Sequence, residues 1–213
     1  MAPANNTARM DMAAGKSDTP RTGDPAFSSA ALLLAEIERL KADIASAQRT
    51  ISELEARADI DPLLEILNRR GFERELKRSL AYLQRYKGEA ALLFIDLDGF
   101  KAVNDRHGHA AGDALLKAVA QELVGHVRAS DVVARLGGDE FGVLLWNLGA
   151  PQAAAKAREL ENLIAAVSVT HGEARLAAGA SAGLAPLAPG AAPDQMIDAA
   201  DKAMYARKKE RRG

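Results

Sequence analysis

The sequence contains no cysteine, few aromatic residues and almost no net charge. Without cysteine the chain has no disulfide, no thiolate zinc site and no cysteine nucleophile. A net charge of −1 at pH 7 argues against a general nucleic-acid binder, because such proteins are usually clearly basic. Aromatic residues make up only 4% of the 213 residues, so we expect a core built mainly from Leu, Ile, Val and Ala.

Long apolar segments are also missing. No stretch approaches the roughly 18 apolar residues that a membrane span requires, and the N-terminal residues lack the apolar segment of a signal peptide. We therefore expect a cytoplasmic protein without a membrane span. Residues 1–27 are rich in Ala, Asp, Thr, Asn, Gly and Pro and show no apolar period, which predicts a disordered tail.

A heptad repeat follows, and it assigns residues 28–60 to a coiled-coil dimerisation helix. Ile occupies three a positions and Leu three d positions of this repeat: Ile37, Ile44, Ile51 and Leu33, Leu40, Leu54. This arrangement favours a parallel two-stranded coiled coil and therefore a homodimer. Glu36 would then face Lys41 of the partner subunit. The alternative is an amphipathic helix packed on its own domain.

The remaining residues, 61–213, combine helical and strand patterns. Helices are expected at 63–86, 112–127, 151–167 and 193–209, strands at 90–97 and 177–187, and a hairpin within 132–146. The helix at 63–86 would begin at Asp61-Pro62, because proline suits the first helical turn. This mixture predicts an α+β domain with a central, mainly antiparallel sheet.

Two acidic pairs are the strongest candidates for chemistry. Asp96 and Asp98 end the expected strand on one face, with Leu97 on the other, and Asp139 and Glu140 follow a glycine pair. If the two strands are neighbours, the oxygen ligands cluster and suit Mg²⁺ or Mn²⁺ together with a nucleoside triphosphate. The alternative is that these acids are solvated turn residues.

The segment between the acidic pairs offers groups that could recognise a base. Asn104 presents an amide and Asp113 a carboxylate, which together match the acceptor and donors of a guanine edge. Gly137 and Gly138 would let a ligand approach the hairpin backbone closely. Taken singly, Asn and Gly here also fit ordinary turn chemistry.

Together these motifs resemble the GGDEF family of diguanylate cyclases. The resemblance rests on the run DLDGFKAVNDRHGHAAGD at 96–113 and on RLGGDEF at 135–141, and it covers residues 61–213. It implies a palm-like, nucleotide-cyclase-like α+β domain whose five-stranded, mainly antiparallel sheet is flanked by helices. It also implies condensation of two GTP into cyclic di-GMP and two pyrophosphates. Because each domain would hold one GTP, a coiled coil would bring two active sites together.

The resemblance assigns roles to individual positions. Two Mg²⁺ or Mn²⁺ ions per active site would be held by Asp96, the Leu97 carbonyl, Asp139 and Glu140. Asp139 would also accept the proton of the attacking 3′-hydroxyl, and Glu140 would assist the second metal. The substrate-binding residues would be Asn104, His109, Asp113, Gly137, Gly138, Lys208 and Arg212.

A second motif, Arg128-Ala-Ser-Asp131, has the spacing of the family's R-x-x-D product-inhibition site. There Arg128 would form a forked contact with the product and Asp131 would accept a hydrogen bond from a guanine. The alternative for such a motif is a surface ion pair.

Some positions depart from the family pattern. Leu64 and Glu65 replace a usual Thr-Gly, Arg211 replaces a common Gly, and the usual last strand is expected to be short or absent. For Lys208 and Arg212 a solvated basic tail is therefore the alternative. Other functions compatible with the sequence are a silent cyclic di-GMP receptor, a cyclase that makes a mixed or single-guanosine cyclic nucleotide, and a coiled-coil adaptor.

Overall fold

The computed structural model describes residues 25–212, with side chains described from 32 to 209 except at 49 and 51–57. Residues 1–52 and 53–213 form two separate units. Most of the expected tail, residues 1–24, lies outside the described residues, and helix α1 extends from Pro25 to Ala58. The side chains of Ile51 and Leu54 are also outside the described set.

Helix α1 leaves apolar side chains exposed along the heptad seam. The exposed fractions are 63% for Leu33, 46% for Ile37, 47% for Leu40 and 58% for Ile44. A row of exposed aliphatic residues at this spacing is the surface that a second helix covers in a coiled coil. Within the described range, none of the helices is both long and apolar enough to cross a bilayer.

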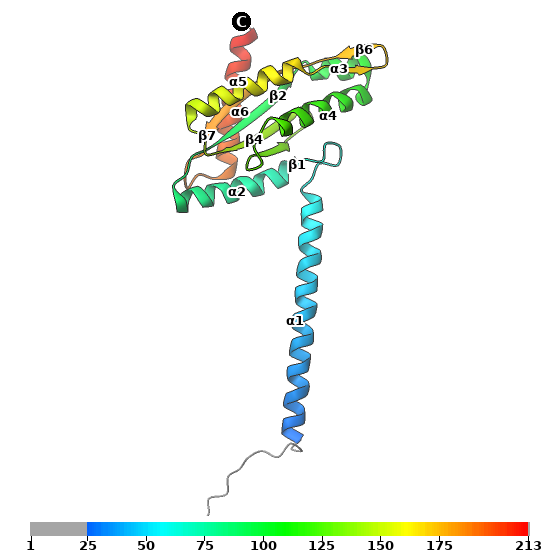
Figure 1. Ribbon diagram of the computed structural model, residues 1–213, viewed down its shortest axis with the longest axis vertical. Coiled ribbons are helices and arrows are strands. Elements are labelled where there is room, and N and C mark those ends of the chain that lie inside the picture. Colours follow the sequence, from blue (N-terminus) through cyan, green and yellow to red (C-terminus); the bar gives the residue numbers. More distant parts are fainter. Residues whose placement is uncertain (1–24, 213) are drawn as a thin grey trace, which may run out of the picture. The chain divides into compact units, whose positions relative to one another are not determined.

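The second unit is an α+β domain (Figure 1). Its elements are β1 (Leu67–Asn68), α2 (Arg69–Tyr86), β2 (Ala90–Asp98), α3 (Phe100–His107), α4 (His109–Gly125), β3 (Val132–Arg135), β4 (Glu140–Trp146), α5 (Ala150–Ala166), β5 (Val169–His171), β6 (Ala174–Leu176), β7 (Gly179–Pro186) and α6 (Pro193–Arg212). The five-stranded sheet has the order β1-β3-β4-β2-β7. Every pairing in it is antiparallel except β1 with β3, which confirms the predicted fold class.

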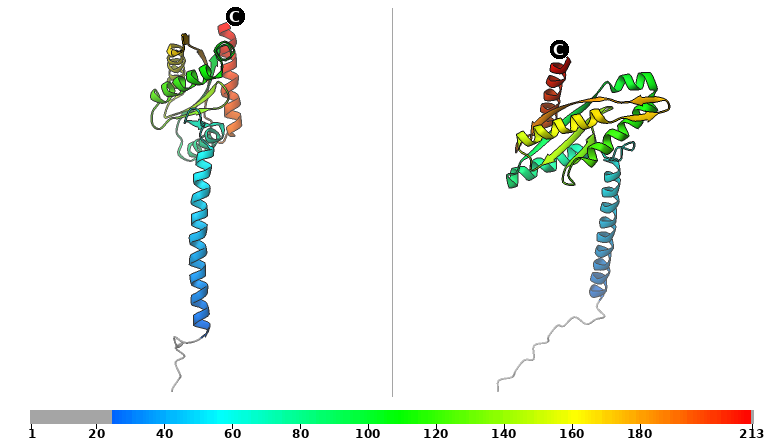
Figure 2. Two further views of the ribbon diagram at one scale, coloured as in Figure 1. Left: turned by 90° about the vertical axis from the view of Figure 1, so that its right-hand side faces the viewer. Right: turned by 45° about the horizontal axis from the view of Figure 1, so that its top comes forward.

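Helices cover both faces of this sheet (Figure 2). In strand β2, which lies between β4 and β7, Ile95 and Leu97 pack in one cluster with α4 and α5. Leu92 and Phe94 pack in the other cluster with α2 and α6. Successive side chains of a strand point to opposite faces, so β2 contributes side chains to both clusters. Because both of its faces are covered, its sequence is a continuous apolar run.

The start of α2 corrects the sequence prediction. The carboxylate of Asp61 accepts hydrogen bonds from the amides of Leu63 and Leu64, both at 2.9 Å, but this closes only a turn. The helix begins at Arg69, where Asn68 is the N-cap and accepts from the Gly71 amide at 3.0 Å. A capping side chain therefore occurs at both places, and only the second one starts a helix.

Glu65, one of the departures from the family pattern, has a φ of 58°. This left-handed conformation favours glycine. We expect Glu65→Gly to raise the free energy of unfolding by about 0.5–1 kcal/mol, because the strain relieved exceeds the entropy that glycine adds to the unfolded chain. Urea denaturation would measure the change. Glu65→Ala, which keeps the Cβ, is the control, and an equal gain from alanine would contradict a backbone cause.

Candidate active site at the acidic end of the sheet

Strand pairing brings the two acidic pairs to one end of the sheet. In register, Asp96 of β2 lies between Glu140 of β4 and Ser181 of β7. The β3–β4 turn returns beside β2, so the Leu97 amide donates to the Asp139 carbonyl at 3.1 Å. The two strands are therefore neighbours, which is the condition for their acidic residues to lie at one end of the sheet.

Lys208 of α6 reaches the same end of β2. Its Nζ contacts the carboxylate of Asp96 and lies 3.3 Å from Asp98 Oδ1. Both aspartates therefore point to one face, as strand alternation predicts, and the buried Ser181 hydroxyl donates to Asp98 Oδ2 at 2.7 Å. Partial burial alone would lower the pKa of Lys208, but hydrogen bonds and charge from Asp96 and then Asp98 raise it overall.

A hollow of about 400 Å³ opens beside these groups. It is lined by Asp96, Leu97, Gly99, Phe100, Lys101, Ala102, Asp105, Asp139 and Lys208. The hollow unites four of the residues that the sequence assigned to metal or substrate: Asp96, Leu97, Asp139 and Lys208. Lys101 and Asp105 were not among those assignments, although both lie in the polar segment that follows Asp98.

The electrostatics of Asp139 fit a cation site. Burial raises the pKa of Asp139, and the negative charge of Asp96 raises it further. Two carboxylates that repel each other at the mouth of a hollow gain from a divalent cation between them, and Mg²⁺ is commonly held by one or two carboxylates plus substrate phosphates. Within the described part of the chain, no group of three or more His, Cys, Asp or Glu side chains is arranged to hold a metal ion. A cation between Asp96 and Asp139 would therefore need further oxygen ligands, which a phosphate-bearing substrate can supply.

Glu140 is placed differently from its acidic neighbour. Its carboxylate lines a second hollow, of about 260 Å³, together with Arg69, whose Nη2 lies 3.7 Å from Glu140 Oε2. Burial raises the pKa of Glu140, and the charge of Arg69 opposes that effect. The structure therefore does not bring Glu140 into the lining of the hollow that holds Asp139.

Helix α3 positions Asn104 against α4. The Oδ1 atom of Asn104 is buried without a hydrogen-bond partner, and it occupies the space where a side chain at Gly112 would lie. Asp113 follows Gly112 in α4 and is half-buried, whereas His109, the first residue of that helix, is exposed. None of Asn104, His109 and Asp113 lines the acidic hollow. An unpartnered buried oxygen suggests a missing donor, which a ligand can supply.

Two arginines hold the glycine hairpin by its backbone. Arg135 Nη2 donates to the Gly138 carbonyl at 2.8 Å, and Arg69 Nε donates to the Leu136 carbonyl at 2.8 Å. A Cβ on Gly138 would meet nothing within 4 Å, whereas one on Gly137 would collide with the Glu140 carboxylate. Sequence reasoning gave these arginines no role. The available signal was the position of Arg135 directly before the hairpin.

The same hairpin is joined to the residues that follow α1. Arg135 Nη1 lies 3.2 Å from Asp61 Oδ2, in a largely buried ion pair. Asn68, besides capping α2, donates from Nδ2 to the Ala58 carbonyl at 2.8 Å. Asp59 is 2% exposed and pairs with Arg70 Nε at 2.8 Å. The end of α1, the start of α2 and the hairpin thus share one hydrogen-bonded network.

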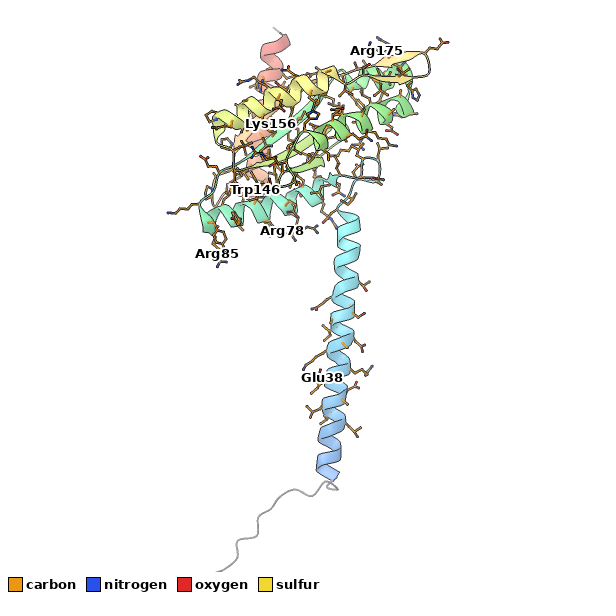
Figure 3. All side chains as sticks on the ribbon, viewed as in Figure 1. Glu38, Arg78, Arg85, Trp146, Lys156 and Arg175 are labelled. Carbon is orange, nitrogen blue, oxygen red and sulfur yellow. The ribbon has the colours of Figure 1, made fainter. Side chains whose placement is uncertain are left out.

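The R-x-x-D motif lies in the turn after α4. Both oxygens of Asp131 accept backbone amides, from Arg128 and from Trp146, each at 3.0 Å. In the described part of the chain no ion pair joins the Arg128 and Asp131 side chains. They line a hollow of about 300 Å³ to which α5 contributes Lys156. Figure 3 labels Lys156 on that helix. Arg212, the last predicted substrate residue, lies outside the described side chains.

Comparisons with known proteins agree with these motifs. The family model described as "Diguanylate cyclase, GGDEF domain" matches residues 58–213. The diguanylate cyclase TpbB of Pseudomonas aeruginosa is 40% identical over 189 residues, which cover 85% of this chain and 41% of TpbB. The chain thus spans less than half the length of that relative.

Two crystal structures from Caulobacter crescentus extend the likeness to the fold. A sensory box/GGDEF family protein is 35% identical with a TM-score of 0.67, over 71% of this chain and 99% of the other. The coiled coil and GGDEF domain of DgcB, in complex with c-di-GMP, is 25% identical with a TM-score of 0.70, over 84% of this chain and 95% of the other. From its motifs, its sheet and the family match over residues 58–213, this chain belongs to the GGDEF diguanylate cyclase family.

Proposed function

We propose that the protein is an active diguanylate cyclase that condenses two GTP into cyclic di-GMP and two pyrophosphates. One observation carries this proposal: Asp96, Asp139 and Lys208 converge on one hollow beside an open glycine hairpin. Two carboxylates and an ammonium group at a solvent-accessible hollow suit a substrate that combines metal ions with a triphosphate.

Asp96, the Leu97 carbonyl and Asp139 would hold Mg²⁺ or Mn²⁺, with Glu140 near a second ion. A bound divalent ion supplies charge neutralisation at the α-phosphate. Asp139 is suited to accept the 3′-hydroxyl proton, because its carboxylate lines the hollow beside the glycine hairpin where the substrate would lie. The 3′-oxygen forms a bond to the α-phosphorus of the other GTP, the bond to the pyrophosphate oxygen breaks, and two such steps close the ring.

Substrate recognition divides between two regions. Asn104 and Asp113 would bind the guanine edge, and the unpartnered Oδ1 of Asn104 supports a ligand donor there. The open space at Gly138 supports close approach of phosphates to the hairpin. Lys208 and Arg212 would hold the terminal phosphates, and His109 would add a further substrate contact.

Each domain would hold one GTP, so two domains must meet. We propose that α1 pairs in parallel with the same helix of a second protomer through its exposed Ile and Leu side chains. Linking the domains in this way raises the effective concentration of the second active site.

Product inhibition is the second part of the proposal. Arg128 and Asp131 line a hollow apart from the acidic one, and the DgcB structure contains c-di-GMP. We expect Arg128→Ala to weaken inhibition by added cyclic di-GMP at least about 10-fold, because the variant loses a forked, charge-assisted contact. Its initial rate without product should match the wild type. Equal inhibition of both proteins would contradict the inhibitory site.

The decisive test of the function is a turnover assay of the full chain with GTP and Mg²⁺, in which products are identified by mass spectrometry and the dimer by light scattering. Cyclic di-GMP and pyrophosphate in a 1:2 ratio support the proposal. Binding of cyclic di-GMP without GTP turnover would support a silent receptor instead. A different cyclic product would identify a related cyclase.

A further inference from the structure

An ion pair between a buried carboxylate and a partly exposed arginine crosses the outer edge of the sheet. Glu161 of α5 is 3% exposed, and its Oε2 lies 3.0 Å from Arg207 Nη2 of α6. Strand β7 is the edge strand of the five-stranded sheet, and both helices pack against it. We call Glu161 and Arg207 the edge pair.

The edge pair also binds the backbone of β7. The Ala182 amide donates to Glu161 Oε1 at 2.8 Å, and Arg207 Nη1 donates to the Ala182 carbonyl at 3.0 Å. Arg207 therefore bonds to α5 and to β7 at once, which fixes both the rotation and the axial position of the C-terminal turns of α6.

Stability alone is a weak explanation for such a pair. Burying the Glu161 carboxylate carries a desolvation cost, and apolar residues of similar volume often stabilise a core equally well. The pair is, however, directional. A forked guanidinium that bonds a carboxylate and a carbonyl permits one geometry, whereas apolar side chains would allow the helix to slide or rotate.

The residue after Arg207 is Lys208, whose ammonium contacts Asp96 and Asp98 at the mouth of the acidic hollow. Successive residues of a helix are rotated by about 100° about its axis. Fixing the Arg207 side chain therefore also fixes the direction in which the Lys208 side chain points. The strand that binds Arg207 through Ala182 also holds Asp98 through the preceding residue, Ser181.

We propose that Glu161 and Arg207 are positioning residues for Lys208: they lock the end of α6 against the edge strand so that the lysine meets the terminal phosphates of a nucleoside triphosphate. This inference rests on the proposed function only in the assignment of a triphosphate to the acidic hollow.

The test is a double-mutant cycle on ligand affinity in the full chain with Mg²⁺, using a non-hydrolysable GTP analogue and GMP as probes. We expect Lys208→Met and Arg207→Met each to weaken binding of the analogue about 10-fold, and the double variant to bind no more weakly than Lys208→Met alone. GMP, which lacks the terminal phosphates, should bind all four proteins equally within about twofold.

Arg207→Met leaves Glu161 charged and buried, so it also loses stability. The variant Glu161→Gln/Arg207→Met removes that charge and should recover thermal stability without recovering affinity for the analogue, which a purely structural role would not produce. Lys202→Met is the matched control, because Lys202 forms an exposed ion pair with Asp198 on the same helix. It should leave both affinities unchanged.

Three results would each overturn the positioning role: additive losses of affinity in the cycle, an equal loss of GMP affinity, or recovery of analogue affinity in the Glu161→Gln/Arg207→Met variant. A wild-type protein that does not bind the analogue would overturn it as well. Because the readout is binding, failure of the proposed cyclase activity is a separate result. A wild type that binds the analogue but releases no cyclic dinucleotide from GTP would refute that activity and leave the cycle interpretable.

Discussion

Asp139→Asn is expected to reduce cyclic di-GMP formation by about 10³-fold or more while the protein stays folded. Removal of a general base typically costs 10²–10⁴-fold, on the order of the effect expected here, and Asp139 would also lose a charge that binds the metal. The measurement is initial rate at saturating GTP, with folding checked by circular dichroism. Glu173→Gln, an exposed carboxylate in the β5–β6 turn, is the control and should retain the full rate.

The same substitution should stabilise the fold at neutral pH. Burial and then Asp96 raise the pKa of Asp139 in the folded state, so its ionised form is favoured less there than in the unfolded chain. The stabilisation from the protonated carboxyl is complete below the unfolded pKa, near about 4, and is lost as the pH rises through the raised folded pKa.

Melting curves recorded in EDTA at pH 3 and pH 7 therefore measure the effect of the substitution on stability separately from its effect on catalysis. Asp139→Asn should melt with the wild type at the low pH and above it at the high pH. A variant that keeps its activity would remove Asp139 from the mechanism. A variant that melts below the wild type at pH 7 would show instead that the carboxylate stabilises the hairpin.

Gly183→Ala is expected to lower the free energy of unfolding by about 3 kcal/mol or more, which is at the upper end for overpacking. Strand β7 and helix α6 touch at this glycine through backbone atoms. An added Cβ would lie 2.7 Å from Met204 Cα and would collide with the Ala200 carbonyl and the Met204 amide. Backbone atoms cannot rotate aside, so the helix itself must move away from the sheet.

Urea denaturation of both proteins would measure that loss. Gly125→Ala is the matched control: it lies at the end of α4, a Cβ there meets nothing within 4 Å, and its stability should be unchanged or up to about 1 kcal/mol higher. Equal stability of Gly183→Ala and wild type would show that α6 can shift without cost.

The fold was largely predictable where local patterns dominate. The apolar run of β2 and the glycine pair between β3 and β4 correctly indicated a buried strand and a hairpin. The start of α2 was wrong because Asp61 and Asn68 both cap backbone amides, and only the left-handed Glu65 between them ends the first turn. Helix α3 is short and polar, and the β5–β6 hairpin has only three residues per strand, so neither produced a clear period.

The positions of Asp96, Asp98 and Asp139 in the candidate site were predictable from the sequence. Those of the residues that hold the site in place were less so. Strand alternation placed Asp96 and Asp98 on one face, and strand pairing brought Asp139 beside them. Arg207 and Glu161 lie 46 residues apart in sequence, and nothing local marks either as a partner of the other. Contacts of that kind depend on how two helices meet across a strand, which a single sequence does not encode locally.

The hydrogen bond from Asn68 to the Ala58 carbonyl has a practical consequence for chimeric signalling proteins. An exchanged N-terminal helix should be fused upstream of Ala58, so that the native Ala58–Asn68 bond and the Asp61–Arg135 ion pair at the hairpin are both kept. Deleting one residue upstream instead would leave those bonds intact while turning the heptad seam by about 100°. A series of such deletions would therefore rotate the heptad positions of α1 in steps while leaving the residues of the α+β domain unchanged.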